Sequence, residues 1–228
     1  MTDHSAEEQK EANIAAMGEE LGTRYSALWQ ELAIGYVYWL EYVDLFGTKS
    51  SRIEMLNQVA PMFFRMIQDE LWGMTLLNLA RMTDPAFSGK DKPNLSIQAL
   101  PLVIRDAGLK STVAKLVDHA SKATEFARDW RNRLIAHRDL GIALNTATAP
   151  LKDASRAQVN DALASLAAVL NALASHFLKS ETRFDMTPRH NGAEELLYLL
   201  DEGLRSEESL KRLESGQAME ADFAAREI

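Results

Sequence analysis

The stretch AQVNDALASLAAVLNALASHFLK, residues 157–179, decides the fold class of this 228-residue chain. Its alanines and leucines recur at the three- and four-residue spacing of a helix. Small alanine side chains allow such a helix to pack closely inside a bundle. Polar residues, among them Ser165, Asn171 and His176, interrupt its apolar character too often for a membrane span. We therefore predict a helix of an all-α, water-soluble protein.

Helical periodicity extends outward from this stretch over nearly the whole chain, and no segment alternates convincingly like a strand. The predicted helices are about 6–46, broken near Gly22; 52–82, kinked or divided at Pro61; 94–107, capped by Asn94 or Ser96; 111–140, stopped by Gly141; 157–179; and 193–215. The segment TDPAFSGKDKPN, residues 83–94, is the clearest loop, because it holds two prolines and a glycine. These elements predict an antiparallel bundle of five to seven helices.

Charge divides the chain into three parts. The overall net charge is −8, of which residues 1–20 carry −5 and residues 193–228 carry −6, so residues 21–192 carry +3. We expect an acidic N-terminal extension at 1–20, a helical body at 21–180, and a turn followed by an acidic helix at 181–228. The mildly basic body is compatible with a polyanionic partner. The terminal acids form either a solvated face or a mask over a basic cleft.

Composition excludes several classes of site. The chain has no cysteine, so disulfides, thiolate zinc sites and cysteine nucleophiles are excluded. No two histidines stand at a metal-ligand spacing, and we predict neither a metal nor another cofactor. The N-terminus MTDHSAEEQKE lacks the apolar core of a signal peptide, which predicts a cytoplasmic protein without a membrane partner.

The nonapeptide RNRLIAHRD, residues 131–139, is the candidate functional site. Arg131 is followed by the amide of Asn132 and then by His137. Imidazole titrates near neutrality and moves protons, whereas guanidinium groups stay charged. Further arginines flank the motif at Arg128, Arg133 and Arg138. This set of residues suits RNA cleavage, although a solvated basic helix end, with its histidine beside a tryptophan, would give the same pattern.

Helix geometry bears on how the motif would act. On an undistorted helix, Arg131 and His137 lie about 120° apart and do not converge on one substrate atom. Either the helix tightens or ends near Ile135, or two copies of the motif meet across a two-fold interface. Such an interface would pool two Arg, two Asn and two His side chains in one cleft.

Four segments carry a resemblance to a known family. They are NQVAPMFF (57–64), NLARMTDP (78–85), NLS (94–96) and WRNRLIAHRDL (130–140). In this order and spacing they resemble the HEPN superfamily, and within it the AbiU-type HEPN domain of bacterial abortive-infection systems. The likeness covers roughly residues 25–180. Many HEPN toxins paired with nucleotidyltransferases carry a tyrosine two residues after the histidine; Asp139 stands there in this chain, so silencing by modification of that tyrosine is not implied.

The resemblance implies a HEPN-type antiparallel helical bundle with N- and C-terminal helical extensions. It also implies a metal-independent RNA endonuclease, dimeric through the motif helix, that acts in phage defence or as a toxin. His137 would move protons, Arg131 would stabilise the phosphorane and Asn132 would orient the histidine or the phosphate. The 2′-hydroxyl of RNA would attack and leave a 2′,3′-cyclic phosphate. Flanking phosphates would contact Arg128, Arg133 and Arg138.

The partners expected from this resemblance are RNA, a second copy of the chain, and an antitoxin or another defence component. Two alternatives remain open. One is a catalytically silent HEPN bundle that binds RNA, nucleotides or proteins. The other is a nucleotide-binding helical domain that does no chemistry.

Overall fold

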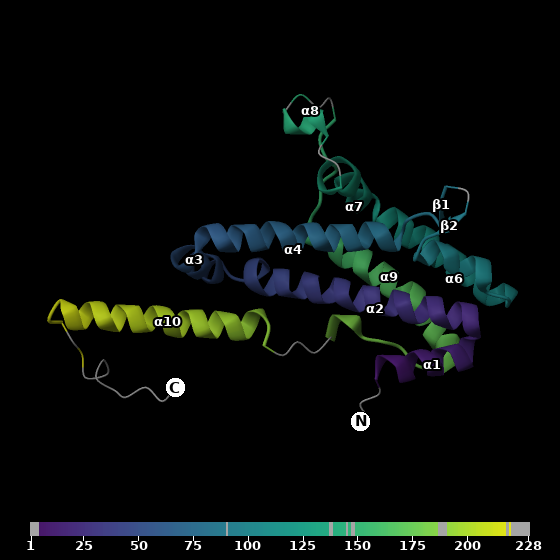
Figure 1. Ribbon diagram of the computed structural model, residues 1–228, viewed down its shortest axis with the longest axis horizontal. Coiled ribbons are helices and arrows are strands. Elements are labelled where there is room, and N and C mark those ends of the chain that lie inside the picture. Colours follow the sequence, from purple (N-terminus) through teal and green to yellow (C-terminus); the bar gives the residue numbers. More distant parts are fainter. Residues whose placement is uncertain are drawn as a thin grey trace. The chain divides into compact units, whose positions relative to one another are not determined.

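The computed structural model describes residues 5–89, 91–136, 139–144, 146, 149–186, 191–217 and 219, and Figure 1 shows that they are almost entirely helical. The α-helices are α1 (Ala6–Met17), α2 (Glu19–Tyr42), α3 (Ser50–Val59), α4 (Pro61–Met82), α5 (Leu100–Val103), α6 (Ala107–Ala123), α7 (Glu125–Trp130), α8 (Leu140–Ala143), α9 (Arg156–Leu178) and α10 (Ala193–Glu214). Val43–Gly47 and Arg131–Ile135 form π-helical turns, and Ile97–Ala99 and Phe184–Met186 form 3₁₀ turns. The all-α fold class is thus confirmed.

The chain forms two compact units. The first comprises residues 1–39 and 72–187, and the second comprises residues 40–71 and 188–228. Neither unit is continuous in sequence, because α2 and α4 each supply residues to both.

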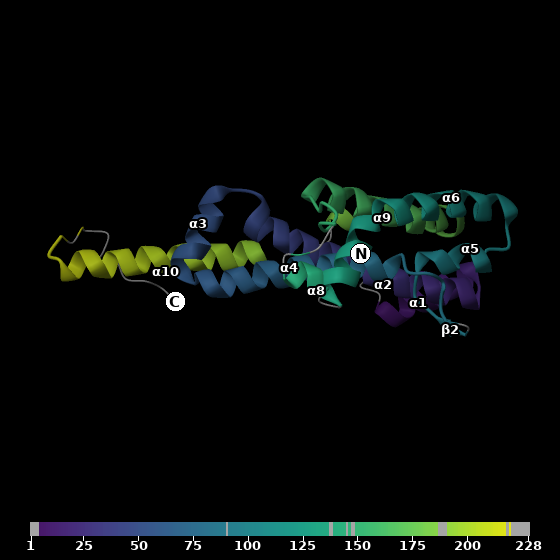
Figure 2. The same cartoon turned by 90° about the horizontal axis from the view of Figure 1, so that it is seen from above.

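Helix α9 is the central element of the first unit. Ser155 caps it reciprocally with Gln158, and the left-handed backbone of Lys179 (φ 53°) ends it. Its buried face carries Val159, Ala162, Leu163, Ser165, Leu166, Val169, Leu170, Leu173 and Ala174. Helix α6 packs along it, as Figure 2 shows. Among the described residues, α9 is the one helix long and apolar enough to cross a membrane, yet half of that stretch is buried within the protein. This burial accords with the place of α9 in the core of the first unit.

Three tryptophans form a continuous aromatic series in the same unit. The ring of Trp72 on α4 lies 6.1 Å from that of Trp39 on α2 and 6.3 Å from that of Trp130 on α7. The Trp39 indole also donates a hydrogen bond to Asn160 of α9. The series therefore links the last residue of α7 to the interior of the bundle.

Proline divides the second predicted helix as expected. Helix α3 ends at Val59 and α4 begins at Pro61, where the missing N–H of the proline removes no helical hydrogen bond. The loop predicted at 83–94 holds one short hairpin, in which β1 (Phe87–Ser88) pairs with β2 (Lys92–Pro93).

Several of the predicted helix boundaries are wrong. The helix expected at 94–107 is reduced to the turn Ile97–Ala99 and the short α5, and the helix expected at 111–140 begins earlier, at Ala107, and is interrupted at Thr124. The first long helix breaks at Gly18, whose φ is +87°, and not near Gly22. Gly141 lies inside α8 and stops nothing, because the Asp139 side chain accepts a hydrogen bond from the Ile142 amide and starts that short helix. The motif helix instead ends at Ile135.

Gly22 has a different role, which is close packing of α1 against α2. A Cβ atom at Gly22 would lie 2.6 Å from the Ile14 Cα atom and 2.7 Å from the Asn13 carbonyl oxygen. Because both are backbone atoms, α1 would have to shift as a whole to make room. Gly73 on α4 provides a matched control, since nothing lies within 4 Å of its Cβ position.

We expect Gly22→Ala to lower the free energy of unfolding by about 1–3 kcal/mol, the usual cost of overpacking. Gly73→Ala should raise it by up to about 1 kcal/mol, because alanine favours the helix. Urea denaturation followed by circular dichroism measures both. Equal stability of the two variants would contradict the close approach of α1.

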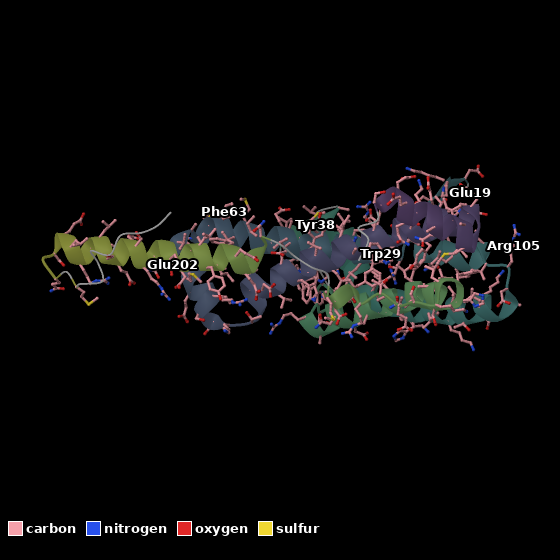
Figure 3. All side chains as sticks on the ribbon, turned by 90° about the horizontal axis from the view of Figure 1, so that it is seen from below. Glu19, Trp29, Tyr38, Phe63, Arg105 and Glu202 are labelled. Carbon is pink, nitrogen blue, oxygen red and sulfur yellow. The ribbon has the colours of Figure 1, made fainter. Side chains whose placement is uncertain are left out.

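The second unit has its own apolar cluster. Its buried members come from the first π-helical turn, α3, α4 and α10, and they are Leu45, Leu56, Phe64, Ala193 and Leu197. The Ala193 amide donates a hydrogen bond to the Glu41 carboxylate, 2.6 Å away, which anchors the first turn of α10. Figure 3 shows Phe63 on α4, whose side chain is half exposed, and Glu202 in the acid-rich part of α10.

Candidate functional site

The motif begins where an α-helix widens. Helix α7 leads directly into the π-helical turn Arg131–Ile135, and the Ala136 amide donates to the Arg131 carbonyl at 2.8 Å, five residues back. Neither a continued regular helix nor a tightened one is present, so the ideal-helix angle between the motif side chains does not apply to this turn. Single π turns of this kind recur at functional sites. His137 and Arg138 lie outside the described residues.

Arg131 and Asn132 are brought together, and a third residue joins them. The Arg131 Nε donates to the Asn132 Oδ1 at 3.0 Å. The Arg131 Nη1 donates to both carboxylate oxygens of Asp84, at 2.5 and 2.7 Å. The Arg131 and Asp84 side chains are 23% and 22% exposed, so solvent reaches this ion pair.

Asp84 is itself held by its surroundings. It follows α4, and its amide donates to the Arg81 carbonyl while its carbonyl accepts from the Ser96 hydroxyl at 2.5 Å. Ser96 is buried and caps the turn Ile97–Ala99 by accepting from the Gln98 amide. The segments NLARMTDP, NLS and WRNRLIAHRDL, distant in sequence, therefore meet at one place.

Arg128 lies in a partly buried network of hydroxyl groups. Its Nη1 donates to the Thr83 and Thr124 hydroxyls at 3.0 and 3.1 Å, and these hydroxyls lie 2.9 Å from each other. Its Nη2 donates to the Ser121 carbonyl at 2.5 Å. The network joins the end of α4 to the start of α7. A contact between Arg128 and a phosphate stays a prediction, since these donors serve the fold here.

The segment Ala149–Lys152, called the strap below, binds along α7 and the π turn. Arg133 donates to the carbonyls of Ala149 and Pro150 at 2.7 and 3.0 Å. The Trp130 indole donates to the Lys152 carbonyl at 2.8 Å. The Arg133 side chain therefore already holds the strap, and a contact between it and a phosphate stays a prediction.

Lys152 closes the strap at its other end. Its amide donates to the Asp129 carboxylate, and its ammonium donates to the Glu125 carboxylate, each at 2.9 Å. The Lys152 ammonium lowers the pKa of the Glu125 carboxyl, chiefly through this hydrogen bond and then through its charge. The contacting residues of α7 and the π turn share one face, spaced by three and four residues.

The chemistry that this arrangement supports is anion binding by an oriented guanidinium. Among the described residues, the Nη2 hydrogens of Arg131 have no partner, whereas its Nε and Nη1 hydrogens are engaged. A planar guanidinium edge of this kind suits the oxygen atoms of a phosphate. Within the described ranges, no group of three or more His, Asp or Glu side chains could hold a metal ion.

The sequence alone does not single out Asp84 as a site residue. The signal that could have identified it is its place in NLARMTDP, one of the four segments that carry the resemblance. A charged residue in such a segment, directly before a proline, can be fixed in direction by the turn that follows.

Comparison with known proteins supplies one match. The family model HEPN_AbiU2, described as AbiU2, matches residues 18–196. This range includes Asp84 and the whole RNRLIAHRD motif. No curated protein and no solved structure matches the chain.

Proposed function

The chain belongs to the HEPN_AbiU2 family, an abortive-infection-related group of HEPN domains, and from this premise we propose that it is a metal-independent RNA endonuclease of phage defence or a toxin. The observation that carries the proposal is the Arg131 guanidinium, which is held by Asp84 and Asn132 and whose Nη2 group has no partner among the described residues. Supporting it are the motif histidine five residues after Asn132 and the widened helix end on which the motif lies.

The proposed reaction is a transesterification within the RNA strand. The 2′-hydroxyl oxygen attacks the adjacent phosphorus, its proton passes to a base, and the P–O5′ bond breaks as that oxygen gains a proton. His137 serves as the proton donor or acceptor, because an imidazole exchanges protons near neutral pH. The Nη2 group of Arg131 donates to the phosphorane oxygens as their charge grows. Asn132 holds the guanidinium through its Oδ1 atom.

End-group analysis tests this chemistry. Purified protein incubated with RNA should give 2′,3′-cyclic phosphate and 5′-hydroxyl ends, and the rate should survive EDTA because no step needs a metal. The ends can be identified by mass spectrometry and by their sensitivity to phosphatase. Products with 3′-hydroxyl and 5′-phosphate ends, or loss of the activity on chelation, would contradict the proposal.

We further propose a two-fold dimer through the motif helices, with RNA bound in the shared cleft and with Arg128, Arg133 and Arg138 near flanking phosphates. In such a cleft the Arg131 of one copy and the His137 of the other can serve one phosphate. An antitoxin or another defence component would then act on the same face. Sedimentation at micromolar concentration tests the assembly, and a monomer there would exclude it.

A silent HEPN module that binds RNA without cleaving it is the second candidate. The observation in its favour is that the Asp84 carboxylate partly neutralises Arg131. The two functions separate in one assay, since a silent module retains RNA in a binding experiment and releases no cleaved product.

A further inference from the structure

We infer that Asp84 is a positioning residue of the RNA-cleaving site, which fixes the direction in which Arg131 presents its Nη2 group. This inference rests on the proposed function. It assigns a role to the turn Thr83–Pro85 after α4. Neither the RNRLIAHRD motif nor the proposed reaction assigns a role to this turn.

The Arg131 guanidinium is a planar group, and its contacts fix its orientation. Arginine has five N–H donors in one rigid plane. The Nε hydrogen is directed to Asn132, and the Nη1 group is directed to the two carboxylate oxygens of Asp84. Because the guanidinium is planar, the contacts of Nε and Nη1 also set the direction of the Nη2 group. The two hydrogens of Nη2 are then the pair presented to a phosphate.

Asp84 is held in place by hydrogen bonds of its own backbone. Its carbonyl oxygen accepts a hydrogen bond from the buried Ser96 hydroxyl, and its amide donates one to a carbonyl in the last turn of α4. Its neighbour Thr83 is 1% exposed and shares the hydroxyl network of Arg128. The carboxylate is thus attached to a fixed part of the backbone, and a side chain that contacts it becomes oriented before substrate arrives.

Asp84 has opposite effects on RNA binding and on the rate of cleavage. Its negative charge reduces the attraction of Arg131 for any phosphate, which weakens RNA binding in the ground state. Its hydrogen bonds remove the freedom of the arginine, which favours the transition state where orientation matters most. Removing Asp84 should therefore lower kcat without weakening RNA binding.

The test compares Asp84→Ala, Asp84→Asn and the control Asp118→Ala in the full-length protein. Asp118 is a suitable control because its exposed carboxylate on α6 pairs with Lys122 and, among the described residues, with no other cation. Asp84→Ala should lower kcat by about 10- to 100-fold, the cost of misplacing a reacting group. Its Kd for 2′-O-methyl RNA, which cannot be cleaved, should equal or fall below that of the wild type. Asp84→Asn keeps one acceptor oxygen, and its kcat should lie between those of Asp84→Ala and the wild type.

Repeating the Asp84 substitution in an Arg131→Lys protein distinguishes a positioning role of Asp84 from a contribution to stability alone. In Arg131→Lys there is no planar fork to orient, so adding Asp84→Ala should have a much smaller effect on kcat than in the wild type. An equal loss in both backgrounds would show that Asp84 serves the fold alone and would overturn the inference. Faster cleavage by Asp84→Ala would also overturn it, because Asp84 would then be an inhibitory group.

One further measurement distinguishes this inference from the proposed function. The Arg131 Nε–Hε resonance, observed by ¹⁵N NMR, should lose order in Asp84→Ala and keep it in Asp118→Ala. Cleavage by the wild type with unchanged kcat and unchanged order in Asp84→Ala would overturn the positioning role alone. No RNA cleavage by the wild type would overturn the proposed function, whatever the resonance shows.

Discussion

Replacing His137 with alanine is expected to lower kcat for RNA cleavage by about 10²- to 10⁴-fold, the usual contribution of a general acid or base. The 2′-hydroxyl is a poor nucleophile until its proton is removed, and the 5′-oxygen is a poor leaving group until it gains one. Single-turnover cleavage of a fluorescent RNA measures the loss. RNA binding should persist, because the cations around the histidine remain.

His119→Ala is the matched control for this variant, since His119 lies exposed on α6 and outside the motif. Both variants should melt within a few degrees of the wild type. Cleavage retained by His137→Ala would exclude the histidine from the reaction and with it the proposed mechanism. Cleavage lost equally in the His119 variant would mean that the assay reports damage to the protein and not chemistry.

Replacing Arg131 is expected to give the second large effect. Arg131→Ala removes the donors aimed at the developing phosphorane charge, which should lower kcat by about 10²- to 10³-fold. Arg131→Lys should recover little of this, because an ammonium group cannot bond Asp84, Asn132 and a phosphate from one rigid plane. Steady-state kinetics on the same RNA gives both values.

The control for charge alone is Arg105→Ala, which removes an exposed cation from the residues between α5 and α6. It should leave kcat unchanged. Full activity of Arg131→Lys would contradict the role of the planar fork and would reduce Arg131 to a source of positive charge. Unfolding of the Arg131 variants is not expected, because solvent still reaches the Asp84 carboxylate when its partner is removed.

The sequence alone sufficed for those parts of the fold that depend on local pattern. The helix at 157–179 is predictable because its apolar periodicity is contained within the segment. Pro61 was correctly placed at a helix boundary for the same reason. The break expected near Gly22 occurs at Gly18, because Gly18 ends a helix by its backbone angle, whereas Gly22 permits close packing. Only the partner helix distinguishes these two roles.

The site was predictable to the extent that it is contiguous. Arg131 and Asn132 are neighbours in the chain, and the Arg131 Nε donates a hydrogen bond to the Asn132 Oδ1. Asp84 stands 47 residues before Arg131, and no periodicity connects them. The π turn likewise has no sequence signature, because its i to i+5 bonding depends on how the end of α7 is held. Carbonyl partners such as those of Arg133 cannot be read from side-chain types at all.

The aromatic series Trp39, Trp72 and Trp130 gives the protein an optical property. With ring centres 6.1 and 6.3 Å apart, neighbouring indoles are close enough for their electronic transitions to couple and for excitation to pass between them. Trp130 directly precedes Arg131, so a nucleobase or phosphate arriving at the motif perturbs one end of a coupled set of chromophores. The near-ultraviolet circular dichroism and the fluorescence anisotropy of the unlabelled protein should therefore report occupancy of the motif.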